Sequence, residues 1–332
     1  MVIEGGMMAL DMKAIKDELR GPVALVMAPF HDDLRLNVTA LRSNLKFLVD
    51  AGVRTGNGFA IAPCGTGEYL SLSDEEHQEM LGVALETVGD AFPVVAGVAG
   101  LNIDRVIELG QHSIDTGARY VMIPPPCYYQ IDEQAMYDWY RIISESLNAG
   151  IMIYDQSWRG TLGTKLTIPL IERLAELPGI VSLKYGSAGI FDEMVVALDR
   201  YADRFVFIDN SLGFTSTVAH MHGATGFISA PLTWWPEFEL EYFHLLETGD
   251  YGAADRLHST LVPYMEWFGG TYTGAGGSHG YYHHAALVKA SLEYVGLYGG
   301  PMRPPFQAVS DVAKEDLFRV MEELGVSKVS AA

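Results

Sequence analysis

The sequence predicts an α/β fold: a (β/α)8 TIM barrel followed by a C-terminal helical extension. Eight short runs of apolar or β-branched residues, each bounded by Gly, Pro or polar residues, have the composition of buried parallel strands. Helix-length segments separate them, and a strand–helix unit recurs roughly every 20 to 35 residues, as expected for a barrel. A dinucleotide-binding sheet would need G-x-G-x-x-G after its first strand, where the chain reads Ala28-Pro29-Phe30.

The predicted elements follow one another along the chain with clear helix-start signals. Ser73 with Glu76 forms a capping box, Asn102 is a plausible N-cap, and Thr167 precedes a proline in the first turn of another helix. We expect an extension over residues 1–20, the barrel over 21–248 and a helical region over 249–332. The expected strands are Val23–Met27, Phe59–Pro63, Val94–Ala99, Tyr120–Ile123, Ile151–Tyr154, Ile180–Lys184, Phe205–Asp209 and Gly226–Ser229.

Composition limits the classes of function. Hydrophobic residues make up 49% and charged residues 19% of the 332 residues, so a sizeable core is expected. The net charge of −20 argues against nucleic acid and anionic membranes as partners. Two cysteines give no disulfide framework, and no apolar run is long enough to span a bilayer. The N-terminus lacks the pattern of a signal peptide, so we expect a soluble, cytoplasmic protein.

Lys184 and Tyr154 are the candidate catalytic residues, because each ends a predicted strand. In a TIM barrel the chemistry lies at the C-terminal ends of the strands. Lys184 ends an otherwise apolar strand, where desolvation disfavours the ammonium and favours a neutral amine that attacks ketones. A phenol beside the resulting iminium can transfer protons. Position alone also fits a lysine that reaches solvent and a tyrosine that packs in the barrel.

Candidate anion-binding groups lie in the loops after the strands. Cys64-Gly65-Thr66-Gly67-Glu68 is a turn whose backbone N–H groups and hydroxyl suit a carboxylate, although a βα loop needs such glycines for its backbone alone. Arg159, five residues after Tyr154, could supply positive charge that the acidic chain otherwise lacks. Ser229 ends the eighth strand. A histidine-rich stretch, Gly269–His284, could bind metal, but we expect no metal and favour a subunit-contact loop.

These motifs together resemble the dihydrodipicolinate synthase / N-acetylneuraminate lyase family, from about Gly21 to Gly325. Each motif is weak alone, whereas their order and spacing are specific to that family. The motifs that carry the resemblance are Met27–Phe30, Cys64–Glu68, Pro93–Gly97, Pro126–Tyr129, Tyr154-Asp155, Ile180–Lys184, Gly226–Ser229 and Gly299–Pro305.

The resemblance implies a role for each matching residue. Lys184 would form the Schiff base and Tyr154 would relay protons. Gly65 and Thr66 would hold the carboxylate of a 2-oxo acid, Arg159 would contact a substrate carboxylate, and Ser229 matches the family's G-x-I-S. Either of two adjacent tyrosines, Tyr128 or Tyr129, would be lent to a neighbouring subunit's site. The family also implies a homotetramer and a metal-independent class I reaction without a cofactor.

Departures from the family pattern bear on the substrate. Gly65 and Tyr185-Gly186 look closer to the 5-dehydro-4-deoxyglucarate dehydratase branch, and Asp155 stands where the family has asparagine. We therefore expect a Schiff-base lyase acting on a small 2-oxo acid, either a pyruvate-type aldolase or a 2-oxo-3-deoxy sugar acid dehydratase. Two alternatives stay open: a catalytically inactive 2-oxo acid-binding or regulatory barrel, and a divalent-metal aldolase that uses the histidines.

Overall fold

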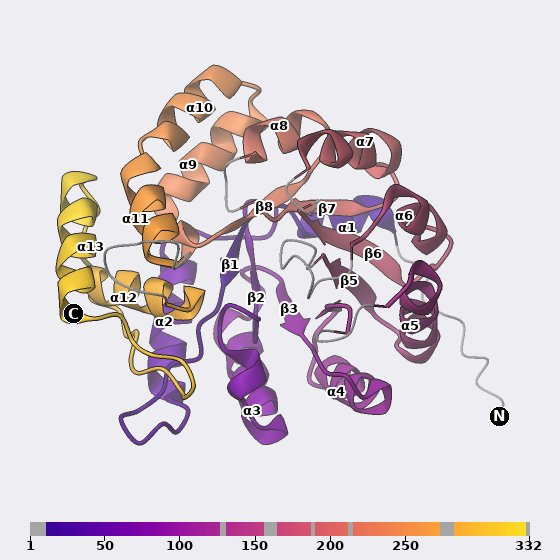
Figure 1. Ribbon diagram of the computed structural model, residues 1–332, viewed down its shortest axis with the longest axis horizontal. Helices are drawn as coiled ribbons and strands as arrows, with labels where there is room; N and C mark the ends of the chain where they lie inside the picture. The colour runs from indigo at the N-terminus through magenta and orange to yellow at the C-terminus, as the bar shows by residue number, and fades with distance from the viewer. Residues whose placement is uncertain are drawn as a thin grey trace. The chain divides into compact units, whose positions relative to one another are not determined.

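The computed structural model describes residues 11–126, 131–155, 165–186, 190–211, 215–272 and 282–329. Its eight parallel strands follow chain order in a closed barrel (Figure 1). The predicted barrel is therefore confirmed, and every expected strand is present with its ends displaced by at most two residues. The strands are β1 (Gly21–Leu25), β2 (Phe59–Ile61), β3 (Val94–Gly97), β4 (Tyr120–Ile123), β5 (Gly150–Tyr154), β6 (Ile180–Tyr185), β7 (Val206–Asp209) and β8 (Gly226–Ser229).

One of two compact units combines the N-terminal residues up to Arg20 with Val94–Phe227. Every residue of β3 to β7 is buried, which explains why these strands read as continuous apolar runs. Successive helices of this unit pack against each other along the strands (Figure 1). Its helices are α1 (Met12–Glu18), α4 (Ile103–Asp115), α5 (Glu133–Ser146), α6 (Ile168–Leu174), α7 (Phe191–Tyr201) and α8 (Ser216–Met221).

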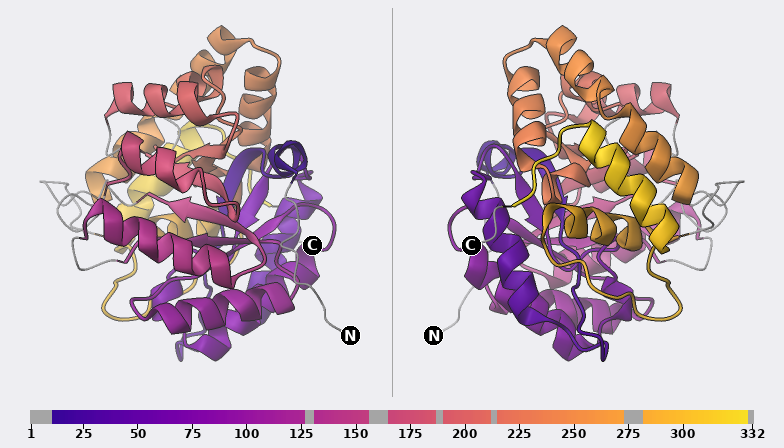
Figure 2. Two further views of the ribbon diagram at one scale, coloured as in Figure 1. Left: turned by 90° about the vertical axis from the view of Figure 1, so that its right-hand side faces the viewer. Right: turned by 90° about the vertical axis from the view of Figure 1, so that its left-hand side faces the viewer.

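The other unit combines Gly21–Pro93 with Ile228–Ala332 and contains the expected C-terminal helices. Here α2 packs on α3, and α13 packs on α11 and α12, as Figure 2 shows. Helix α12 is unusual because its residues Ala285–Leu292 are all buried, including one lysine. The helices are α2 (Val38–Asp50), α3 (Asp74–Val88), α9 (Pro236–Glu247), α10 (Tyr251–Ser259), α11 (Val262–Tyr272), α12 (His284–Val295) and α13 (Asp311–Glu323).

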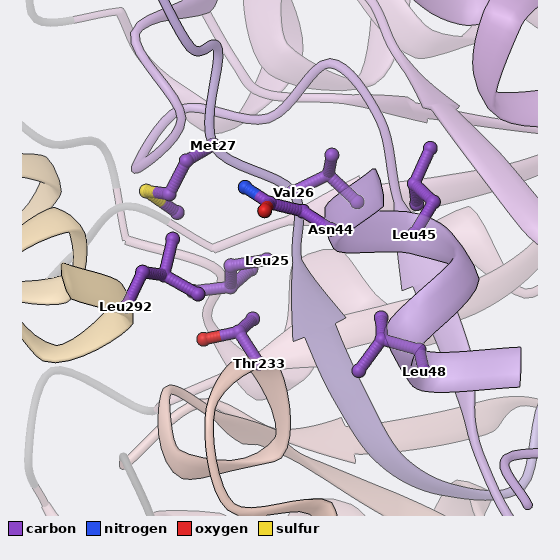
Figure 3. Close-up of a pocket in the computed structure, with 8 residues that line it drawn as sticks. All are labelled: Leu25, Val26, Met27, Asn44, Leu45, Leu48, Thr233 and Leu292. Atoms are coloured by element: carbon purple, nitrogen blue, oxygen red, sulfur yellow. The ribbon is translucent and has the colours of Figure 1, made fainter. Parts of the chain in front are cut away.

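A small cavity in this second unit is a packing gap. Leucine side chains from β1, α2 and α12 converge on it, together with Asn44 and Thr233 (Figure 3). Its volume of about 20 Å³ has room for about one water molecule. The Asn44 amide donates to the Tyr298 carbonyl oxygen at 2.8 Å, so this polar side chain already has a protein partner. Nothing larger than a water would fit this gap.

The predicted helix starts are confirmed by side-chain caps. The Ser73 hydroxyl accepts from the Glu76 N–H while the Glu76 carboxylate accepts from the Ser73 N–H, completing the capping box of α3. Asn102 accepts from two backbone N–H groups at the start of α4, and Thr167 caps α6. Within the described ranges, none of the helices has the length and apolar character that crossing a bilayer requires.

Replacing the α3 cap tests this assignment. Ser73→Ala removes the acceptor for the Glu76 N–H, so the free energy of unfolding should fall by about 1 kcal/mol. The urea midpoint measures this loss. Ser327→Ala, at an exposed serine outside the helices, is the matched control and should leave the midpoint unchanged. Equal midpoints for both variants would show that the cap contributes nothing.

Candidate active site

Lys184 and Tyr154 lie directly opposite each other across β5 and β6. The pairing of these two strands shifts by one residue: Ile151 pairs with Ile180, whereas Met152 pairs with Ser182. The extra residue in β6 brings Tyr154 opposite Lys184. Since side chains alternate between the two faces of a strand, this β-bulge also puts both side chains on the same face. The sequence predicted that the two residues lie at the ends of neighbouring strands. The structure places them at or within one residue of those ends and shows that they pair.

The amine and the phenol ring are buried together. Lys184 is 4% exposed and Tyr154 is 8% exposed. The Lys184 Nζ lies 3.7 Å from the centroid of the Tyr154 ring. The next residue, Tyr185, has a different environment: its ring packs edge-on against Phe207, and its hydroxyl donates to the Leu166 carbonyl oxygen at 3.4 Å. Burial raises the pKa of Tyr185, which makes its hydroxyl a poor proton donor.

Asp155 has a structural contact that the sequence left open. Its side chain is fully buried, and its Oδ2 accepts from the Gly186 N–H at 3.1 Å. Its own backbone N–H donates to the Lys184 carbonyl oxygen at 2.9 Å. Asp155 therefore fixes the backbone on both sides of Tyr185, just after the lysine. An asparagine oxygen could make the same contact, so the departure from the family pattern preserves this interaction.

The Cys64–Glu68 turn is anchored at its C-terminal half. The Gly67 carbonyl oxygen accepts from the Ala28 N–H at 3.2 Å, and a Cβ at Gly67 would lie 2.1 Å from the Val26 oxygen, so a side chain is excluded there. Gly65 and Thr66 are partly exposed. Toward the described part of the chain, neither their backbone N–H groups nor the Thr66 hydroxyl makes a hydrogen bond. These donors are therefore available to a ligand.

Glu68 ends the turn in a buried ion pair with Lys289 of α12, and sequence reasoning missed this pair. The Lys289 Nζ lies 2.6 Å from Glu68 Oε2, and the exposed fractions of the two side chains are 2% and 0%. The residues are separated by 221 positions, so no local pattern could relate them. The one available signal was a lysine in the middle of the mostly apolar run Ala285–Leu292.

Ser229 is buried and its hydroxyl has protein partners. Its Oγ accepts from the Leu232 N–H at 2.8 Å and hydrogen-bonds to the carboxyl group of Glu239 in α9. Burial raises the pKa of Glu239 to about 7. The other carboxyl oxygen, Oε2, has no partner among the described residues. Substrate binding by Ser229 stays a prediction, and Glu239 is a second residue that the sequence did not single out.

Tyr128, Tyr129 and Arg159 lie outside the described residues, as does most of the Gly269–His284 stretch. At the end of that stretch, His283 accepts from the Ala285 N–H and caps α12, and His284 stacks on Phe268. Among the described residues, His, Cys, Asp and Glu form no cluster that could bind a metal ion.

Comparison with known proteins identifies the family. The model of the Dihydrodipicolinate synthetase family matches residues 18–324. The chain belongs to this family. It is 28% identical to the 4-hydroxy-tetrahydrodipicolinate synthase of Methanothrix thermoacetophila, over 92% of this chain and 97% of that protein. The synthase of Methanopyrus kandleri is also 28% identical, over 93% and 97% of the two chains.

Solved structures show the same fold. The dihydrodipicolinate synthase of Oceanobacillus iheyensis superposes with a TM-score of 0.83 at 23% identity, covering 95% of this chain and 99% of that one. A pyruvate complex of the Acinetobacter baumannii synthase gives 0.82 at 21% identity, covering 93% and 99%. Membership in the family makes the chain a Schiff-base lyase for pyruvate-type substrates. The expected closeness to the 5-dehydro-4-deoxyglucarate dehydratase branch finds no support among these relatives.

The buried Glu239 predicts a pH dependence of stability. Its folded pKa of about 7 lies above the ordinary value of 4.5, so the folded chain holds a proton that the unfolded chain has lost. This contribution, at most about 3 kcal/mol, is complete below pH 4.5 and is lost as the pH rises through 7.

A glutamine variant removes that titration. Glu239→Gln should therefore lose less stability than the wild type between pH 5 and pH 8, as measured by urea midpoints at both pH values. Glu241→Gln, on the exposed side of the same helix, is the control and should keep the wild-type slope. If Glu239→Gln lost as much stability between pH 5 and pH 8 as the wild type does, the raised pKa assigned to Glu239 would be wrong.

Proposed function

We propose that Lys184 forms a Schiff base with the carbonyl carbon of a small 2-oxo acid and that Tyr154 transfers the protons. The single observation that carries this proposal is the alignment of a buried amine with a buried phenol at the ends of β5 and β6. Burial disfavours the ammonium form, so a neutral amine is available for attack. The family relationship supports a lyase, either a pyruvate-type aldolase or a 2-oxo-3-deoxy sugar acid dehydratase.

Both reactions share their first steps. The Lys184 amine adds to the carbonyl carbon, and water leaves to give an iminium ion. The iminium accepts the electron pair left when a proton departs from the adjacent carbon, which gives an enamine. In an aldolase the enamine carbon then adds to an aldehyde, whereas in a dehydratase hydroxide leaves from the next carbon. Tyr154, as the phenol beside the amine, carries protons in each case.

Other residues would hold the substrate. The N–H groups of Gly65 and Thr66 have no partner among the described residues and, with the Thr66 hydroxyl, suit a carboxylate. Arg159 would bind a second anionic group, and Ser229 would line the mouth of the barrel. The family resemblance assigns Tyr128 or Tyr129 to a neighbouring subunit's site, which requires a homo-oligomer, and the same resemblance implies a homotetramer. We assign no metal and no cofactor to the reaction.

Borohydride trapping tests the Schiff base directly. The wild type incubated with pyruvate and borohydride should gain the mass of the reduced adduct at Lys184, located by peptide mass spectrometry. Lys184→Ala should gain none. Lys165→Ala is the control, because Lys165, just before α6, forms an ion pair with Glu193 of α7 and should not affect trapping.

Three results would contradict this assignment. An unmodified wild type that still binds pyruvate would favour a catalytically inactive 2-oxo acid-binding barrel. Turnover by Lys184→Ala would exclude the lysine as nucleophile. Loss of activity on adding a chelator would favour a metal aldolase. Release of pyruvate or of water from a panel of 2-oxo and 3-deoxy sugar acids separates the aldolase from the dehydratase.

Removing the phenol should separate imine formation from proton transfer. Tyr154→Phe keeps the ring over Lys184 and should still be trapped by borohydride. Exchange of the pyruvate methyl protons in deuterated water needs the enamine, so it should slow about 10²–10⁴-fold, as followed by NMR. Tyr185→Phe is the control, because that hydroxyl is tied to the Leu166 oxygen, and it should exchange normally. Equal exchange by both variants would exclude Tyr154 from proton transfer.

A further inference from the structure

Glu68 holds its backbone in an uncommon conformation. Its φ of +66° lies in the left-handed region, which non-glycine residues rarely adopt. Its carboxylate is buried, and both oxygens are used: Oε2 pairs with the Lys289 Nζ at 2.6 Å, and Oε1 accepts from the Arg303 N–H at 3.2 Å. A side chain fixed at both oxygens holds its own backbone, so these contacts determine where the Cys64–Glu68 turn ends.

The Lys289 ammonium has further contacts besides Glu68. Its Nζ also donates to the Pro301 carbonyl oxygen at 2.8 Å and lies 4.7 Å from the centroid of the Phe30 ring. Gly299 allows the chain to pass close to this helix, because a Cβ there would lie 2.3 Å from the Lys289 oxygen. Burial lowers the pKa of Lys289, while the Glu68 carboxylate opposes that shift. The ammonium therefore occupies one place beneath the turn.

Arg303 adds a second anchor that is independent of Lys289. Its guanidinium pairs with both oxygens of Glu76 in α3 and donates to the Leu34 carbonyl oxygen at 3.0 Å through Nε. It also lies over the Phe30 ring, 4.1 Å from the centroid. The segment around Arg303 is therefore held by α3 and by the loop after β1. Its backbone N–H can then act as a fixed donor to Glu68.

We propose that the Lys289–Glu68 ion pair is a positioning pair that aims the Gly65 and Thr66 N–H groups at the carboxylate of the substrate. The proposal rests on the proposed function, in which this turn binds a 2-oxo acid. A buried ion pair adds little net stability, because desolvation offsets the attraction. Here the ion pair instead orients the Cys64–Glu68 turn. It holds Glu68 at one end of the turn, while the other end continues from β2. The pair should therefore affect affinity for the carboxylate, not the amine chemistry.

Three variants separate positioning from folding. Glu68→Gln and Lys289→Met each leave one buried charge unpaired, which destabilises the fold. The double variant, Glu68→Gln with Lys289→Met, leaves no unpaired charge, so it should melt at a higher temperature than either single variant while lacking the ion pair. Lys314→Met is the matched control, because it breaks an exposed ion pair between α13 and α12.

Two ketones provide the readout. Borohydride labelling of Lys184 is measured against pyruvate concentration and, separately, with acetone, which forms an imine but has no carboxylate. In the folded double variant, the pyruvate concentration for half-labelling should rise about tenfold, as expected when a hydrogen bond to a charged group is lost. Maximal labelling by pyruvate and the rate of labelling by acetone should match those of the wild type.

The outcomes distinguish this proposal from the function on which it rests. Wild-type half-labelling in the double variant would overturn the positioning role, and so would an equal loss of labelling by acetone, which would indicate general damage. A wild type that pyruvate does not label would overturn the Schiff-base assignment and this proposal with it. If Lys314→Met also raised the pyruvate concentration for half-labelling about tenfold, the effect would not be specific to the Lys289–Glu68 pair, and the positioning role would be overturned.

Discussion

The register of β5 against β6 is the constraint on which the proposed chemistry depends. Without the extra residue in β6, Tyr154 would pair with Leu183, and the lysine side chain would point to the opposite face. Gly150 permits this arrangement, because a Cβ there would lie 2.9 Å from the Val181 side chain at the bulge. Asp155 then holds the backbone beyond the lysine through the Gly186 N–H. The pairing of amine and phenol is thus a property of the backbone, which the surrounding side chains stabilise.

A second constraint organises the turn that we assign to the carboxylate. Three segments that are remote in sequence meet around the Glu68–Lys289 pair. They are the segment after β1, through Phe30, the turn itself, and the chain between Gly299 and Arg303. Glu68 makes directional polar contacts with Lys289 and Arg303, and both cations lie over the Phe30 ring. Gly67 and Gly299 lie where a side chain would collide with backbone. The C-terminal helices therefore do more than cover apolar surface, because α12 carries the cation that balances the glutamate of the turn.

The sequence was sufficient for features that depend on nearby residues, and insufficient for those that depend on distant ones. Strand composition, the Ser73 capping box and the positions of Lys184 and Tyr154 at or within one residue of a strand end are local patterns, and the structure confirms them. The bulge depends on how two strands pair, which periodicity within either strand does not encode. The Lys289–Glu68 pair joins residues 221 positions apart, so its only trace in the sequence was a lysine in the middle of the mostly apolar run Ala285–Leu292.

The acidic composition can be reconciled with an anionic substrate through oriented dipoles. With a net charge of −20, the chain offers little long-range attraction to a 2-oxo acid. The two cations nearest Glu68, Lys289 and Arg303, are already balanced by carboxylates. Backbone N–H groups in a fixed turn bind a carboxylate without adding charge. In the proposed mechanism, imine formation would convert the Lys184 amine into an iminium cation attached to the substrate itself, so positive charge would arise only after capture of the ketone and directly beside its carboxylate.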